Sequence, residues 1–124
     1  MGHLLVVLCA AKPGRDEELN AWYDAVHVHD MLETIEGFDS VRRFVRADLP
    51  DVPIHPYRYL AIYEVSDLEL AHEQFQMQRA QRAEALATGR EPLVAASGAM
   101  ADDVLVGFFS ALGDPVVSTR AKAQ

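Results

Sequence analysis

The sequence predicts an α+β fold in which four strands and two helices follow one another in the order β-α-β-β-α-β. Three observations predict this order. Apolar residues form one short run near the N-terminus and alternate with polar residues in later segments. Between these segments, apolar residues recur at three- and four-residue spacing, which is typical of helices with one covered face. Glycine and proline residues separate the segments.

The first strand is the apolar segment from Leu4 to Ala11. It is far shorter than the roughly 20 residues that cross a bilayer, and it lacks a positively charged leader, so we expect a buried strand rather than a signal segment. A helix is expected to begin near Arg15, because three carboxylates follow where the helix dipole favours negative charge. We expect Gly37 to end this helix in the left-handed conformation.

A two-residue period then predicts a second strand over residues 38–47, and three prolines make residues 48–56 a loop. One face of the second strand would carry Phe38, Ser40, Arg42, Phe44 and Arg46, and the other Val41, Arg43 and Val45. The third strand is expected over residues 57–65. Its tyrosines, Tyr57, Tyr59 and Tyr63, share one face.

A second helix should begin after Asp67 and end at Gly89, with Arg79 and Arg82 interrupting its weak apolar stripe. Residues 89–101 are rich in Ala, Gly and Ser and are expected to be flexible, and residues 104–112 form the fourth strand. The sequence thus predicts a single domain over residues 1–112 and a polar C-terminal tail over residues 113–124.

This order of elements is the ferredoxin-like arrangement, in which two helices cover one face of a four-stranded antiparallel sheet. We expect the other face to carry Tyr and Phe residues that are too apolar to leave in water. Two chains are therefore expected to pack sheet against sheet as a homodimer.

Composition excludes several kinds of partner. The 124 residues fit one domain, and a net charge of −8 opposes binding to nucleic acid or to anionic membranes. The single cysteine, Cys9, cannot form an internal disulfide or a paired-cysteine zinc site. We therefore expect a cytoplasmic protein with neither a nucleic-acid nor a membrane partner.

The segment from Trp22 to Asp30, with the pattern W-Y-x-x-x-H-x-x-D, is followed by Gly37-Phe38 and by Arg42-Arg43-Phe44. This pattern resembles the dimeric α/β-barrel superfamily, particularly its small EthD-like members, although His29 stands where many such sequences have proline. The resemblance covers roughly residues 3–110 and implies two ferredoxin-like chains forming a dimeric α/β barrel. The superfamily includes polyketide cyclases, lactone isomerases, small monooxygenases, haem-handling proteins and members with no assigned activity.

Helical spacing places Tyr23, His27 and Asp30 on one side of the first helix. A carboxylate that accepts a hydrogen bond from an imidazole fixes its tautomer and raises its basicity, so Asp30 would orient His27 as a general acid and base. Tyr23 would donate a hydrogen bond to a carbonyl or enolate oxygen. The alternative interpretation is that His27 is a partly buried helix histidine with no catalytic role.

Several further residues are candidates for binding a flat, ring-bearing substrate. Trp22 and the aromatic face of Tyr57, Tyr59 and Tyr63 would line an apolar pocket. Arg42 beside Phe44 would hold a carboxylate or enolate oxygen. Core packing and surface ion pairs are the alternatives for these residues. His27 and His29 point about 200° apart on a helix, so we expect no metal site.

We therefore expect a cofactor-independent enzyme that acts by proton transfer on an aromatic, polyketide-like or lactone substrate, as a cyclase, an isomerase or a lyase such as a dehydratase. The reaction class follows from the resemblance, and the residue roles follow from helical spacing. One alternative is a noncatalytic ligand-binding or accessory protein. Another is a small monooxygenase that is cofactor-free or uses haem.

Overall fold

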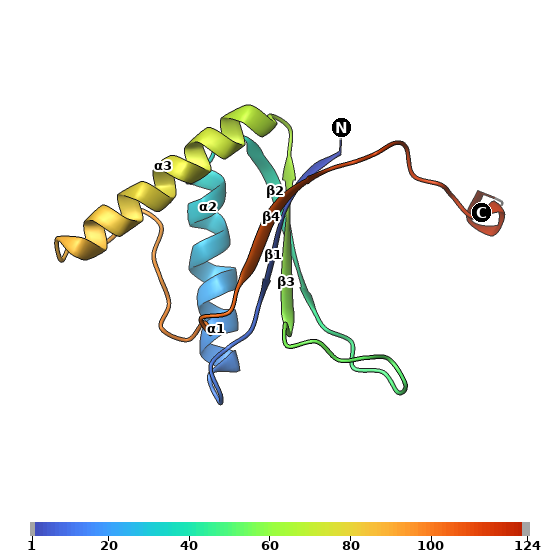
Figure 1. Ribbon diagram of the computed structural model, residues 1–124, viewed down its shortest axis with the longest axis horizontal. Helices are drawn as coiled ribbons and strands as arrows, with labels where there is room; N and C mark the ends of the chain where they lie inside the picture. The colour runs from blue at the N-terminus through green and yellow to red at the C-terminus, as the bar shows by residue number, and fades with distance from the viewer. Residues whose placement is uncertain (1, 123–124) are drawn as a thin grey trace.

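The structure is a computed structural model that describes residues 2–122 (Figure 1). The strands are β1 (His3–Cys9), β2 (Phe38–Val45), β3 (Tyr59–Val65) and β4 (Leu105–Ser110). The helices are α1 (Asp16–Trp22), η1 (Tyr23–His27), α2 (Val28–Thr34), α3 (Leu68–Ala87) and α4 (Thr119–Lys122). Because η1 is a π-helical turn between α1 and α2, these three elements form one helix with a single wide turn inside it.

The strands form one sheet in the order β2-β3-β1-β4, and every neighbouring pair is antiparallel. The α1–η1–α2 helix and α3 lie on the same side of this sheet (Figure 1). The predicted ferredoxin-like α+β fold is confirmed. The strand limits differ slightly from the prediction, since β1 ends at Cys9 and β3 begins at Tyr59.

The helices begin and end largely where the sequence predicts. The α1 helix follows Arg15, and the Asp67 side chain caps α3 by accepting a hydrogen bond from the Leu70 amide at 3.0 Å. Gly89 takes a left-handed φ of 73° after α3. Gly37 does not take this conformation. Instead, it lies against Ala71, where a side chain would not fit.

The core lies between the sheet and the helices, and it corrects the expected position of the tyrosines. Tyr59 and Tyr63 alternate with outward-facing residues along β3 and are buried beneath the helices. The open face of the sheet carries aliphatic residues and phenylalanine instead. In register across the four strands, the apolar residues of this face are Leu4, Val6, Leu8, Phe44, Leu60, Ile62, Leu105 and Phe109.

A register irregularity near the start of β2 corrects the predicted faces of this strand. Phe38 and Ser40 pair with the consecutive residues Val65 and Glu64, so Phe38 lies on the helix-covered face while Arg42 and Phe44 stay on the open face. Strict alternation from Phe38 would have placed all three together. The bulge thus adds an aromatic ring to the core.

The segment between α3 and β4 is ordered by contacts and is not the flexible stretch that its composition indicates. Val94 and Ala99 are buried, and the Lys12 amide donates a hydrogen bond to the Ala99 carbonyl at 2.8 Å. The Arg15 guanidinium also donates to the Gly98 carbonyl at 2.9 Å. The segment therefore covers one end of the space between the helices and the sheet.

Candidate functional site

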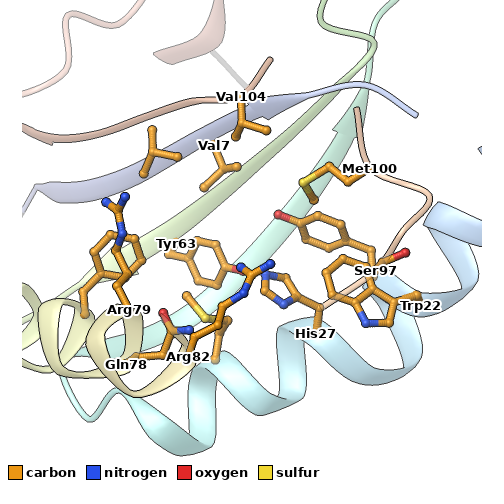
Figure 2. A pocket seen from close by; sticks show the side chains of 14 residues that line it. Val7, Trp22, His27, Tyr63, Gln78, Arg79, Arg82, Ser97, Met100 and Val104 are labelled. Atoms are coloured by element: carbon orange, nitrogen blue, oxygen red, sulfur yellow. The ribbon is translucent and has the colours of Figure 1, made fainter. Parts of the chain in front are cut away.

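A cavity of about 280 Å³ lies between the long first helix, α3, the segment after α3 and the sheet. Its lining combines rings, valine and methionine side chains, and two arginines (Figure 2). The lining includes Trp22, Tyr23, His27, Tyr63, Phe75, Gln78, Arg79 and Arg82. The volume is at the lower end of the range for small-molecule sites, which indicates a small ligand.

The π-helical turn η1 brings Trp22 and His27 together. In a regular α-helix, residues five apart point about 140° away from each other, but the wider turn of a π-helix brings them onto one side. The two rings stack with their centroids 4.5 Å apart and an interplanar angle of 24°. Tyr23 meets His27 edge to face at 4.8 Å. Helical spacing predicts the contact between Tyr23 and His27 but not the contact between Trp22 and His27.

Three buried polar atoms of the cavity lining have no hydrogen-bond partner among the described residues. They are the Nδ1 atom of His27, the Nε1 atom of Trp22 and the hydroxyl oxygen of Tyr63. Buried polar groups are almost always hydrogen-bonded, because leaving one unpaired costs about 1–3 kcal/mol. A ligand with oxygen or nitrogen atoms can supply the missing partners.

Burial sets the ionisation state of these side chains. Burial and, to a smaller extent, the positive charge of Arg82 lower the pKa of His27 to about 4, while Asp30 acts in the opposite direction. Burial also raises the pKa of Tyr23 well above its usual value and the pKa of Tyr63 to about 12. Near neutral pH the site therefore holds an uncharged imidazole and two phenols that keep their protons.

Asp30 does not orient His27 in the way that the spacing predicts. Its carboxylate accepts a hydrogen bond from the Ala95 amide at 3.4 Å, and no hydrogen bond joins it to His27 within the described chain. The wide turn of η1 aims the imidazole at Trp22 and Tyr23, whereas Asp30, on α2, reaches the segment that covers the cavity. Asp30 thus supports the wall of the cavity.

Several predicted binding residues lie outside the cavity. Arg42 and Phe44 are on the open face of the sheet, where the guanidinium carbon is 5.1 Å from the ring centroid. Tyr59 faces the helices but lies nearer the start of α1, where its hydroxyl donates to Asp16 at 2.6 Å and accepts from Asn20 at 3.2 Å. Of the predicted binding residues, the cavity therefore includes Trp22 and Tyr63.

Arg43, on the helix-covered face of β2, is a part of the site that sequence reasoning missed. It donates to Asp24 and to Asn20 at 2.8 Å each, and its guanidinium carbon lies 4.3 Å from the centroid of the Tyr23 ring. The sequence feature that could have identified Arg43 is its position between Val41 and Val45 on an otherwise apolar strand face. Arg43 therefore lies over the face of the Tyr23 ring, next to the cavity lining.

The α3 helix contributes three polar residues that sequence reasoning did not assign to the site. Gln78, Arg79 and Arg82 all line the cavity, and the Arg82 guanidinium lies beside the imidazole of His27 (Figure 2). The sequence feature that could have identified them is the interruption of the apolar stripe of this helix by two arginines. These residues place positive charge at the mouth of an aromatic cavity.

Neither a metal cluster nor a membrane helix is found in the described part of the chain. Residues 2–120 bring together no group of three His, Cys, Asp or Glu side chains suited to holding a metal ion. No helix described by the structure is long and apolar enough to cross a bilayer.

Burial raises the pKa of the Cys9 thiol, which lies in the core.

Comparisons with known proteins find likeness in structure only. No family model and no curated protein matches the sequence. An ethyl tert-butyl ether d (EthD) family protein from Bacillus halodurans is 14% identical, with a TM-score of 0.53, and covers 86% of this chain and 97% of its own.

Two further solved structures share the fold. A dimeric ferredoxin-like protein of unknown function from Thermobifida fusca is 12% identical, with a TM-score of 0.53 and coverage of 90% of this chain and 92% of its own. A point mutant of MhuD, with two manganese protoporphyrin IX molecules bound per active site, is 16% identical, with a TM-score of 0.54 and coverage of 93% of this chain and 99% of its own. These likenesses show that the chain has the ferredoxin-like fold.

Proposed function

We propose that the chain is a small-molecule enzyme that transfers protons on a flat, ring-bearing substrate, with His27 as the acid and base. One observation carries the proposal: the imidazole of His27 is uncharged at neutral pH and lines a cavity that also contains two protonated phenols. Aldol-type cyclisation, isomerisation through an enolate and β-elimination in carbonyl compounds share one first step, the removal of a proton next to the carbonyl group. The arrangement supports this shared step.

The roles of the side chains follow from their charge states. The imidazole of His27 takes a proton from the carbon next to the substrate carbonyl, and the electron pair of the broken C–H bond moves onto the carbonyl oxygen. The Tyr63 hydroxyl, which has no partner among the described residues, donates a hydrogen bond to that oxygen. Tyr23 is a second donor in the same cavity, and the imidazolium then returns its proton to the intermediate or to a leaving group.

The step is tested by deuterium exchange on a bicyclic aromatic ketone, 2-tetralone, in heavy water. We expect the protein to speed incorporation of deuterium next to the carbonyl and His27→Gln to reduce the rate about 10²- to 10⁴-fold, because the general base is lost. NMR spectroscopy of the ketone measures the exchange.

His29→Gln is the matched control, because His29 is exposed on the same helix and lies outside the cavity lining. Its exchange rate should equal that of the unmodified protein. Equal rates in the folded His27 variant and in the unmodified protein would remove His27 from the mechanism.

A noncatalytic ligand-binding role is the second candidate, and the missing hydrogen bond between His27 and Asp30 favours it. This role predicts binding of the ketone without enhanced exchange. The monooxygenase alternative is supported by the shared fold of MhuD, a protein solved with bound porphyrin. A cavity of about 280 Å³ favours a ligand smaller than a porphyrin. Oxygen uptake during substrate consumption would distinguish this alternative from proton transfer.

We also propose that two chains pack through the open faces of their sheets. Phe109, at 58% exposed, and Leu105, at 52%, belong to a contiguous apolar face that helices do not cover. Apolar patches of this kind mark interaction sites, and a twofold axis lets the same face serve both chains. The Thermobifida fusca protein with this fold is described as dimeric, which supports a homodimer here.

A further inference from the structure

The middle of α3 presents an unusual set of polar groups to the cavity. Gln78 is 7% exposed and is the buried polar residue among those that the structure describes. Arg79 and Arg82, respectively one and four positions later, line the same cavity. Figure 2 shows all three side chains extending from α3 to the cavity, with the Arg82 guanidinium beside the imidazole of His27.

Both arginines lack an acidic partner among the described residues, although the chain has a net charge of −8. Arg15, Arg43, Arg46, Arg58 and Arg90 each pair with a carboxylate. Arg79 instead lies over the Phe75 ring, with its guanidinium carbon 5.7 Å from the centroid. In so acidic a protein, two guanidinium groups at one cavity that pair with no described carboxylate can hold an anion supplied from outside.

We propose that the ligand of this cavity is a small aromatic carboxylic acid, whose carboxylate is held by Arg79, Arg82 and the amide of Gln78. This inference deepens the proposed function and rests on the same site. Guanidinium groups match the planar geometry of a carboxylate, and charge-assisted hydrogen bonds of this kind are about twice as strong as neutral ones. The aromatic body of the ligand would lie against Trp22 and Phe75, which supply apolar area.

A ligand carboxylate bound at Arg82 also affects the pKa of His27. Arg82 is the charged group that contributes most to keeping His27 uncharged. A carboxylate bound to Arg82 offsets this positive charge, which raises the pKa of His27 from about 4 towards the range where an imidazole is an effective base. Substrate recognition and activation of the base are thereby linked through one guanidinium group.

The test compares two probes of the same shape, 2-naphthoate and its uncharged analogue 2-naphthamide, by isothermal titration calorimetry with the full chain. We expect naphthoate to bind about 10- to 100-fold more tightly than the amide, because only the acid forms charge-assisted bonds. Quenching of Trp22, the single tryptophan, reports that binding occurs in this cavity.

Arg82→Gln and Arg79→Gln should each weaken naphthoate binding about 10-fold or more and leave naphthamide binding nearly unchanged. Arg120→Gln is the matched control, because it removes the same charge from α4 and not from the cavity. Both cavity arginines are exposed, so these variants are expected to fold, and circular dichroism checks this.

Equal affinities of the two probes, an Arg82 variant that binds naphthoate normally, or no binding of naphthoate would each overturn the inference. None of these outcomes decides whether His27 transfers protons, because the exchange test uses a ketone without a carboxylate. Conversely, charge-selective binding with no loss of exchange in the His27 variant would support the acid site and reject the proposed proton transfer.

Discussion

At the scale of single residues, His27 is surrounded by charged groups with opposing effects on its pKa. Burial, Arg82 and Arg43 disfavour protonation of His27, whereas Asp30 favours it. Burial and Arg82 have the largest effects. The pKa of about 4 lies below the usual value of 6.5. The folded protein therefore binds fewer protons at this residue than the unfolded chain does between these two values.

This difference predicts a loss of stability in mild acid. Above about pH 6.5, His27 is neutral in both the folded and the unfolded chain and does not change the free energy of unfolding. As the pH falls towards 4, only the unfolded chain gains the proton, so the folded state becomes less stable. From about pH 7 to about pH 4.5, His27 should contribute a loss of roughly 2 kcal/mol in the free energy of unfolding. Urea denaturation at the two pH values measures this change.

His27→Gln isolates this contribution, because glutamine does not titrate and all carboxylates stay in place. The variant should lose less stability than the unmodified protein over the same interval. Identical losses in the two proteins would show that His27 has the same pKa in the folded and unfolded states.

The sequence predicts some of these residues better than others. Four-residue spacing is sufficient to place Tyr23 beside His27, since either kind of helical turn keeps them close. Spacing predicts a hydrogen bond between Asp30 and His27 that the structure does not form, because spacing along one helix says nothing about the Ala95 amide, which arrives from a distant segment. Arg43, Gln78, Arg79 and Arg82 were missed for the same reason: their importance depends on which elements pack together.

At the scale of elements, Gly37 sets how closely the α2–β2 connection approaches α3. A Cβ atom at this position would lie 2.6 Å from the Ala71 Cβ and 2.7 Å from its backbone nitrogen. Real contacts of this kind are longer than 3 Å. The absence of a side chain at Gly37 therefore permits the close packing of the helix layer.

Gly37→Ala should therefore destabilise the fold by about 1–3 kcal/mol, because the backbone of α3 must shift to accept the methyl group. Thermal and urea denaturation measure the loss. Gly113→Ala is the control, since a Cβ atom there meets nothing within 4 Å. If the two variants are equally stable, the contact between Gly37 and Ala71 is looser in solution.

The elements themselves were predictable, but two local irregularities were not. Apolar periodicity identifies the strands and helices, because burial on one face imposes a period of about two or 3.6 residues. The π-helical turn and the bulge after Phe38 each add one residue without disturbing the pattern on either side. Both nevertheless change which side chains meet, placing Trp22 over His27 and Phe38 in the core.

At the scale of the whole molecule, the open face of the sheet is the largest feature that the single chain does not explain. Ordinary helix-on-sheet packing buries one face of a sheet, and here the other face is also apolar. The sequence correctly predicts that one face of the sheet is left uncovered by helices. It wrongly places the tyrosines on that face, because Tyr59 and Tyr63 point into the core. A homodimer and a cytoplasmic location remain predictions.

Phe109→Lys should disrupt the proposed homodimer, because it places a charge in the middle of an apolar interface. We expect the dissociation constant of the dimer to rise about 100-fold or more. Light scattering after size-exclusion chromatography, over a range of concentrations, measures it. Met77→Lys is the control, since Met77 is exposed on α3. A monomer in the unmodified protein at micromolar concentration would contradict the proposed assembly.

The wide turn η1 has a consequence for how such proteins diversify. It corresponds to a single extra residue within a helix whose flanking turns, α1 and α2, keep their regular form. A chain lacking that residue would retain the same architecture while losing the stacked rings beside the cavity. One insertion or deletion can therefore create or remove the chemistry of this site within an unchanged scaffold, so likeness of scaffold carries little information about reactivity.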